Sequence, residues 1–192
     1  MTIELALIRK TALFLLLVLA PAFAAAQNGV APRWEVFGGY SYLRLDSTTF
    51  GFANWTNLNG WNAAGTFNLN LKWSATIDLS GHYGSQLSTF NYMIGPQYAW
   101  RRDKSKFFIH GLGGKGQNRV NIPSGNVNYF ESVGRAFAAG GGYDWDWSPR
   151  ITFRVVQGDY LNTSTFGKTQ NDIRVSTGVI FHFGRIGHHP KL

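Results

Sequence analysis

The sequence predicts an all-β fold, an eight-stranded antiparallel up-and-down transmembrane β-barrel. Three observations support it: short segments in which apolar and polar residues alternate, connections that are in turn short and long, and aromatic residues near the segment ends. Side chains of a strand point to opposite faces in turn, so each segment has one apolar face and one polar face. Aromatic residues make up 16% of the chain and charged residues 15%, against about 25% charged in an average soluble domain.

The first four expected strands are 34–46, 61–70, 71–84 and 88–100. In the first, Val and Tyr alternate with Glu and Ser; in the second, Ala, Phe and Leu alternate with Asn and Thr. The third, LKWSATIDLSGHYG, is the most regular, because every second residue from Leu71 to Tyr83 is apolar or glycine. The fourth sets Phe, Tyr, Ile and Trp against Thr, Asn and Gln.

The last four expected strands are 106–116, 132–147, 151–161 and 171–184. Phe and Ile oppose His in the fifth, and aromatic residues and Ala oppose Asp in the sixth. The alternation in the seventh slips at Val155–Val156, which predicts a β-bulge. In the eighth, Ile, Val and Phe face away from Asp, Arg, Ser and His.

The connections predict a meander with tight turns at one rim and long loops at the other. One connection on the long side, 85–87, is itself short. The tight turns are expected at 70–72, 101–105 and 148–150, and the long polar loops at 47–60, 117–131 and 162–170.

The apolar face has three possible environments. It can form the core of a soluble sandwich or calyx, contact a second subunit as an oligomeric sheet surface, or face lipid in a membrane barrel. Aromatic rings with a polar edge settle where hydrocarbon meets water, and small bacterial barrels have strands of roughly 9–11 residues and an even strand number from eight. Two aromatic belts separated by small and aliphatic residues therefore favour the membrane barrel. The expected membrane-interface aromatics are Trp34, Trp73, Trp100, Trp145, Trp147, Tyr42, Trp61 and Tyr83.

In a membrane barrel the polar faces line the lumen. Buried charges must be paired, and the polar faces carry both signs of charge. We therefore expect a lumen filled by a network of side chains, with little space for a wide pore. Its predicted members are Lys72, Asp78, His82, Gln97, Asp144, Asp146, Arg154, Arg174 and His182.

The first 26 residues have the pattern of a secretory signal peptide: basic residues, an apolar run and small residues at a cleavage site. Cleavage is expected after Ala26 or after Ala24, which leaves a barrel over 27–184 and a short tail over 185–192. Cysteine is absent, which excludes disulfides and thiolate metal sites. The formal charge of +8 comes from scattered cations, and export argues against a nucleic-acid partner.

The segments FGGYSYLRLD, VVQGDYLNTSTFG and NDIRVSTGVIFHFG, together with the export signal, resemble the small outer-membrane β-barrel proteins of the OmpA and OmpX type. The resemblance covers about residues 30–184 and implies an outer-membrane location in a Gram-negative bacterium. It also implies that Phe181 and Phe183 of the last strand are read by the barrel-assembly machinery, although GRIGHHPKL follows Phe183 here. No peptidoglycan-binding domain follows the barrel in this sequence.

Three motifs have a chemical alternative. GLGGKG (111–116) matches a dinucleotide-binding pattern, but no helix is predicted after it. Asp144 and Asp146 can hold a lumen cation or pair with Arg154, Arg174 or Lys72, and pairing is favoured. The tail pair His188 and His189 lacks a third ligand. We predict no cofactor and no metal.

The sequence favours a structural, envelope or adhesin-like role for a monomeric barrel. Its expected partners are outer-membrane lipid and lipopolysaccharide, the barrel-assembly machinery and a ligand of the external loops. A narrow channel for ions or very small solutes is the alternative. A lipid A-modifying enzyme is a third reading, because Ser80 and His82 share a strand face, with Glu131 or Asp159 as an orienting carboxylate.

Overall fold

The computed structural model describes residues 31–46, 55–121, 129–165 and 167–184. All regular secondary structure in this part of the chain is β-strand, and no helix in it is long and apolar enough to cross a membrane. The predicted signal peptide (1–26) and tail (185–192) lie outside the described residues.

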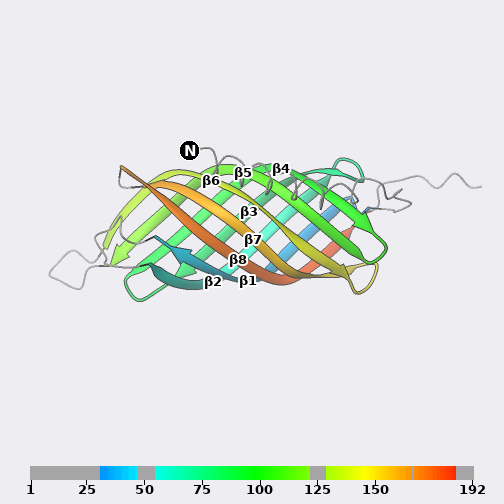
Figure 1. Ribbon diagram of the computed structural model, residues 1–192, viewed down its shortest axis with the longest axis horizontal. Coiled ribbons are helices and arrows are strands. Elements are labelled where there is room, and N and C mark those ends of the chain that lie inside the picture. The colour runs from blue at the N-terminus through cyan, green and yellow to red at the C-terminus, as the bar shows by residue number, and fades with distance from the viewer. Residues whose placement is uncertain (1–30, 47–54, 122–128, 166, 185–192) are drawn as a thin grey trace, which may run out of the picture.

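Eight strands form one closed barrel in which each strand pairs antiparallel with the next, and the last pairs with the first (Figure 1). The strands are tilted relative to the long axis of the barrel. This confirms the predicted fold. The strands are β1 Trp34–Leu45, β2 Thr56–Asn68, β3 Trp73–Tyr83, β4 Leu87–Arg102, β5 Ser105–Asn121, β6 Tyr129–Asp146, β7 Ile151–Thr165 and β8 Lys168–Phe183.

The two ends of the barrel differ. Trp34 at the start of β1 is opposite Phe67 of β2 and Phe183 of β8, so both ends of the described barrel lie at the rim with the tight turns. At this rim β4 and β5 are joined by two residues, of which Asp103 has a φ of 46°. We call this the turn end, and the opposite rim the loop end.

The predicted loop over 162–170 is wrong. Strand β7 continues to Thr165 and β8 begins at Lys168, with Asn162 opposite Asn171 in the ladder. Gly167 lies in the connection at a φ of 70°, a conformation that glycine adopts without strain. The polar residues therefore form a hairpin that extends the barrel wall.

Two other predicted loops are shorter than expected for the same reason. Strand β5 runs to Asn121 and β6 begins at Tyr129, while β2 begins at Thr56. The GLGGKG motif lies inside β5 and not at a strand end. Its glycines belong to the barrel wall, and a Cβ added at Gly111 would meet no atom within 4 Å.

The predicted bulge is confirmed. The register between β7 and β8 shifts between Arg154 and Gln157, and the register between β6 and β7 shifts at Tyr143/Asp144. Val155 and Val156 are consecutive and both exposed, while Arg154 and Gln157 on either side are buried. One extra residue thus restores the inward direction of the polar face in the loop-end half of β7.

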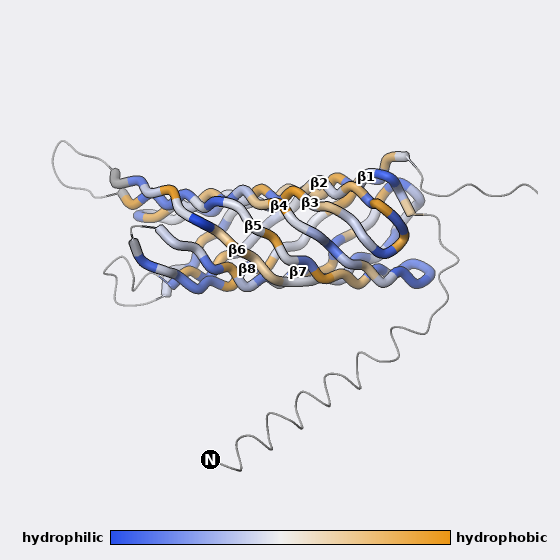
Figure 2. The backbone as a smooth tube through the Cα atoms, turned by 90° about the horizontal axis from the view of Figure 1, so that it is seen from above, coloured by the Kyte–Doolittle hydropathy of each residue, from blue (hydrophilic) through white to orange (hydrophobic). Residues whose placement is uncertain are grey.

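The strands alternate between exposed and buried side chains along nearly their whole length. In β3 the exposed residues are apolar and the buried ones are polar, the reverse of a soluble domain. Figure 2 shows hydrophilic and hydrophobic residues mixed along the strands of the wall. The barrel is therefore apolar outside, and its interior carries the charged groups.

Candidate functional site

The barrel interior is the candidate functional site, and Arg174 of β8 lies at its centre. Its guanidinium Nη1 is 2.7 Å from Oδ1 of Asp78 on β3, and its Nε donates to Oδ2 of Asp159 on β7 at 2.8 Å. Arg174 has 0% of its surface exposed. The planar guanidinium can donate hydrogen bonds to two carboxylates at once in a fixed geometry, which suits this position better than a lysine ammonium.

Asp159 links this pair to the rest of the network. His110 Nε2 lies 2.8 Å from Asp159 Oδ1, and Gln157 donates through Nε2 to Oδ2 at 2.8 Å. The amide oxygen of Gln157 in turn accepts from Nη1 of Arg154 at 2.6 Å. The side chains thus form a continuous hydrogen-bonded path along the interior of β7.

A second cluster of charges continues toward the turn end. Arg154 binds Asp144 through Nε at 2.8 Å, and the Lys106 ammonium lies 3.0 Å from the same carboxylate. Lys106 also pairs with Glu35 of β1. Glu35 accepts from Arg101 Nη2 at 2.7 Å. The path therefore runs from Arg101 at the rim to the centre of the barrel.

Two aromatic rings enclose Arg154. The ring centroids of Phe37 and Phe108 are each 4.4 Å from its Cζ atom. A cation over an aromatic face gains about 0.5–1 kcal/mol at an exposed site and more when it is desolvated. Arg154 is thus held by ionic and aromatic contacts together.

The charges in this network balance. Ionised groups are costly to bury unless they are paired and hydrogen-bonded, and here equal numbers of cations and carboxylates share their ion pairs. The set consists of four cations, Arg101, Lys106, Arg154 and Arg174, and four carboxylates, Glu35, Asp78, Asp144 and Asp159.

Uncharged side chains occupy the next level of the interior. The Nε2 atom of His82 lies 2.8 Å from Ser41 Oγ, which is 2.9 Å from Ser176 Oγ. Asn62 donates to the second oxygen of Asp78 at 2.8 Å. These contacts join β1, β2, β3 and β8 across the lumen.

An apolar cluster fills the lumen beyond this level, toward the loop end. On β1 the inward residues change from Ser41 to Leu43, and on β7 they change from Asp159 to Leu161. Close packing of such residues excludes water. The buried members are Leu43, Leu45, Leu58, Leu87, Met93, Leu112, Ala136, Ala138 and Leu161.

The outer wall is apolar around the barrel. Its exposed residues include Val36 of β1, Ile77 of β3, Ile94 of β4, Phe137 of β6 and Val175 of β8. Aromatic rings contact one another along the turn end, where Trp73 and Tyr98 lie 4.9 Å apart between centroids. The described wall is therefore mainly apolar between its two rims, and its charged residues, among them Lys115, Arg135 and the Arg119–Glu131 pair, lie in the loop-end half.

Solved structures share this fold, although no protein-family model matches the sequence and no curated protein matches it significantly. Surface protein A (NspA) of Neisseria has a TM-score of 0.63 at 10% identity, over 81% of this chain and 100% of that one. The attachment invasion locus protein Ail of Yersinia pestis has a TM-score of 0.55 at 16% identity, over 79% and 99% of the two chains. The fold is that of the OmpA/OmpX-type barrels.

Two more structures agree. The N-terminal β-barrel domain of OprF from Pseudomonas aeruginosa has a TM-score of 0.50 at 9% identity, over 78% of this chain and 98% of that one. Ail in complex with the heparin analogue sucrose octasulfate has a TM-score of 0.53 at 13% identity, over 79% and 99%. This chain spans these barrels almost completely, so the likeness covers the whole fold and not a fragment of it.

The structure places most predicted lumen residues inside the barrel. Two lie half-buried at the turn end: Asp146, which accepts from Thr152, and His182. Lys72 is a wrong prediction, because it lies exposed in the turn between β2 and β3. The buried members are Asp78, His82, Gln97, Asp144, Arg154 and Arg174.

Most of the predicted interface aromatics lie near strand ends, whereas Trp61 lies near the middle of β2. Trp100 and Tyr42 are half-buried, and the other six are exposed on the outer wall or the rim. Phe181 and Phe183 of the last strand are exposed as well. The turn end thus carries Trp34, Trp73, Trp100, Trp145 and Trp147, whereas the second belt at the loop end stays a prediction.

Sequence reasoning missed several network members and the whole apolar cluster. Glu35, Lys106, His110, Gln157 and Asp159 are buried in the network. Glu35, Lys106 and His110 have the parity of the polar faces of β1 and β5, and Gln157 and Asp159 continue the polar face of β7 beyond the bulge. This alternation is the signal that could have found them. The cluster leucines share that parity too, but a leucine on the polar face of a strand was not predicted to point inward.

The catalytic alternative finds no geometric support in the described residues. Ser80 Oγ has no hydrogen bond within this part of the structure, and His82 contacts Ser41 instead. Glu131 lies on the outer wall with Arg119, and Asp159 is held by Arg174. Asp144 and Asp146 have separate partners, and no group of three metal-binding side chains occurs among the described residues.

Proposed function

We propose that this chain is an integral outer-membrane β-barrel with a structural or surface-interaction role in the envelope of a Gram-negative bacterium. One observation carries the proposal: the closed barrel exposes aliphatic and aromatic side chains around its wall and pairs eight charged groups inside. Exposing such a large apolar surface is unfavourable in water and favourable in the hydrocarbon of a bilayer. Closure also pairs the backbone of every strand, which a bilayer requires.

The orientation follows from the connections. Bacterial outer-membrane barrels have short periplasmic turns and longer external loops. The turn end therefore faces the periplasm, with Trp34, Trp73 and Trp145 at the inner interface, and the loop end faces the exterior. Phe181 and Phe183 would be available on the last strand to the barrel-assembly machinery. A monomer suffices, because one chain closes the sheet.

The interior favours a sealed barrel over a channel. A water-filled pore exposes the side chains that line it, but Arg174, Asp78 and His82 are almost inaccessible. The apolar cluster, which includes Leu43 and Leu161, adds a second barrier nearer the loop end. Ions would have to break the paired charges and cross this dry layer.

The external end supplies the surface for interaction. At this end the β7–β8 hairpin and the ends of the long strands β5 and β6 extend the barrel wall. Ail has been crystallised with a sulfated sugar analogue, which supports a role of this kind for a barrel of the same shape. An external ligand for this chain is accordingly part of the proposal. Catalysis is not, because no described serine and histidine form a nucleophile–base pair open to substrate.

Two measurements test the proposal. Cell-envelope fractionation should recover the mature protein in the outer membrane, with an electrophoretic mobility that changes on heating. Planar-bilayer recording of the folded protein should show no discrete conductance steps. Recovery as a dispersed protein in detergent-free buffer would reject the membrane assignment. Regular single-channel steps would reject the sealed barrel and favour the narrow channel.

A further inference from the structure

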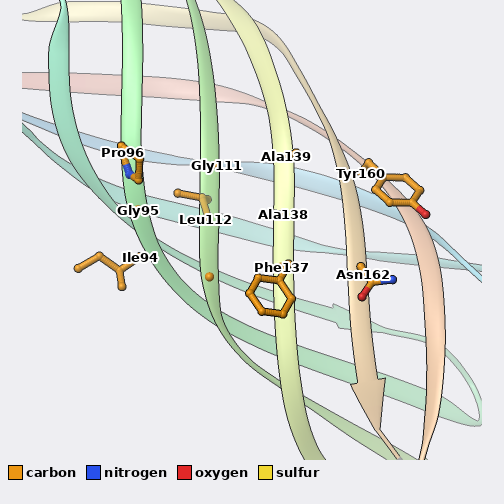
Figure 3. Close-up of a pocket in the computed structure, with 11 residues that line it drawn as sticks. Ile94, Gly95, Pro96, Gly111, Leu112, Phe137, Ala138, Ala139, Tyr160 and Asn162 are labelled. Carbon is orange, nitrogen blue, oxygen red and sulfur yellow. The ribbon is translucent and has the colours of Figure 1, made fainter.

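The outer wall has a groove over β4, β5, β6 and β7. Its volume is about 540 Å³, and it is lined mainly by apolar and small residues (Figure 3). Ile94, Phe137 and Tyr160 border it (Figure 3), and Gly113 of β5 lies between Ile94 and Phe137 in the ladder. Gly111 of β5 lines it too. The glycines leave the groove open, because a Cβ added at Gly111 would meet no atom within 4 Å.

Two cations lie directly beyond the groove on its loop-end side. Lys115 is two residues from Gly113 on β5, and Arg135 is two residues from Phe137 on β6. Two residues of strand span about 7 Å. Both side chains are exposed on the same outer wall, so they lie just beyond the loop-end edge of the groove.

Lys115 and Arg135 also face each other. They are direct partners in the β5–β6 ladder, and such partners have Cβ atoms about 4.5–5.5 Å apart. Like charges at this separation destabilise a sheet. Neither forms an ion pair with any residue in the described ranges, whereas Arg119, the next cation along the wall, pairs with Glu131.

We propose that this surface binds a phosphorylated glycolipid of the outer leaflet, with a phosphate between Lys115 and Arg135 and an acyl chain in the groove. The inference rests on the proposed outer-membrane location. The charge complementarity identifies the occupant: two adjacent cations in the loop-end half of β5 and β6, beside an apolar groove, match an anionic headgroup next to hydrocarbon. Ser164, opposite Arg135 on β7, adds a hydroxyl at the level of the sugar.

The test uses the folded full barrel in detergent micelles and native mass spectrometry with bis-phosphorylated lipid A as the probe. Wild-type protein should retain lipid A. The double variant K115Q/R135Q should lose at least about tenfold in affinity, since each interfacial cation contributes roughly 1 kcal/mol with an anionic membrane. Gly111→Leu, whose Cβ would meet no atom within 4 Å and whose side chain occupies groove space, should lower retention too.

Matched controls separate the site from general effects. Lys72→Gln removes an exposed cation at the turn end, and Gly65→Leu adds the same side chain to the wall where a Cβ meets no atom within 4 Å. Both should stay within about twofold of wild type. A heat-modifiable gel shift confirms that each variant is folded.

Two further arms identify the ligand. Dephosphorylated lipid A and phosphatidylglycerol should each bind more weakly than bis-phosphorylated lipid A. Equal retention by K115Q/R135Q and wild type would overturn the site, and equal binding of phosphatidylglycerol would overturn the glycolipid assignment. Either result in a folded, membrane-inserted barrel leaves the proposed function standing, so the two proposals fail separately.

Discussion

The guanidinium of Arg174 and the carboxylate of Asp78 meet inside the barrel at 2.7 Å, although 96 residues separate them in the chain. The contact joins β8 to β3 across the lumen, so it exists only when the sheet has closed. Because Asp159 binds the same guanidinium, three strands depend on one side chain. The interior ion pairs therefore stabilise the closed barrel and also fill its lumen.

Removing this cation should be costly. Arg174→Leu leaves Asp78 without its ion-pair partner and deprives Asp159 of its arginine, and breaking one side of a buried pair costs about 3–5 kcal/mol. Urea unfolding in micelles, followed by tryptophan fluorescence, measures the loss. Arg119→Gln is the matched control, because its pair with Glu131 is 47% and 33% exposed and such pairs contribute at most about 1 kcal/mol. Similar losses in the two variants would show that the lumen network does not stabilise the barrel.

The apolar cluster should behave as a packed core. Leu161→Ala leaves a cavity that the rigid wall cannot close, so it should cost about 2–5 kcal/mol. Leu79→Ala removes the same atoms from the outer wall, where lipid can fill the space, so its cost lacks the cavity contribution. The difference between the two variants in unfolding free energy is the informative quantity. If Leu79→Ala is the more damaging change, the apolar core has been assigned to the wrong side of the wall.

A charge introduced on the outer wall tests whether this surface faces lipid or water. Ile77 is 53% exposed in the middle of β3, and a lysine there should cost about 2–4 kcal/mol if it lies near the bilayer centre. The control, Leu69→Lys, changes an exposed residue in the β2–β3 turn and should be nearly neutral. Folding yield and stability in lipid vesicles measure both. A neutral Ile77→Lys variant would mean that this surface faces water.

The sequence predicts the faces of the strands well because side-chain direction is a local property. Asp78, Asp144 and Arg174 all lie inside, as the alternation indicates. The bulge at Val155–Val156 was visible for the same reason, since two consecutive apolar residues break the alternation. No long-range information is needed for either inference.

Strand ends are a different matter, because they depend on pairing with a neighbour. Asn162 and Thr163 have the composition of a loop, yet each has a partner in β8 that continues the ladder. Lys72 has the parity of a lumen residue but lies in the turn, where parity no longer sets direction. Nothing in the local sequence marks either boundary.

The composition of the lumen also depends on three-dimensional context. Leucines 43 and 161 have the same parity as the charged residues, but only the tilt of eight strands brings them to one level. The partners of each charge are equally non-local: Glu35 meets Lys106 across 71 residues. The sequence therefore predicts which side chains enter the lumen better than it predicts which of them touch.

The most direct test of the inside-out barrel is a methyl NMR measurement in lipid nanodiscs. Nuclear Overhauser effects to lipid acyl chains should appear for Ile77, Leu79 and Ile173, which are exposed on the wall. They should be absent for Leu161 and Ile180, which are buried inside. Cross-peaks between Ile77 and methyl groups on the opposite side of the barrel, or acyl-chain contacts from Leu161, would contradict the account.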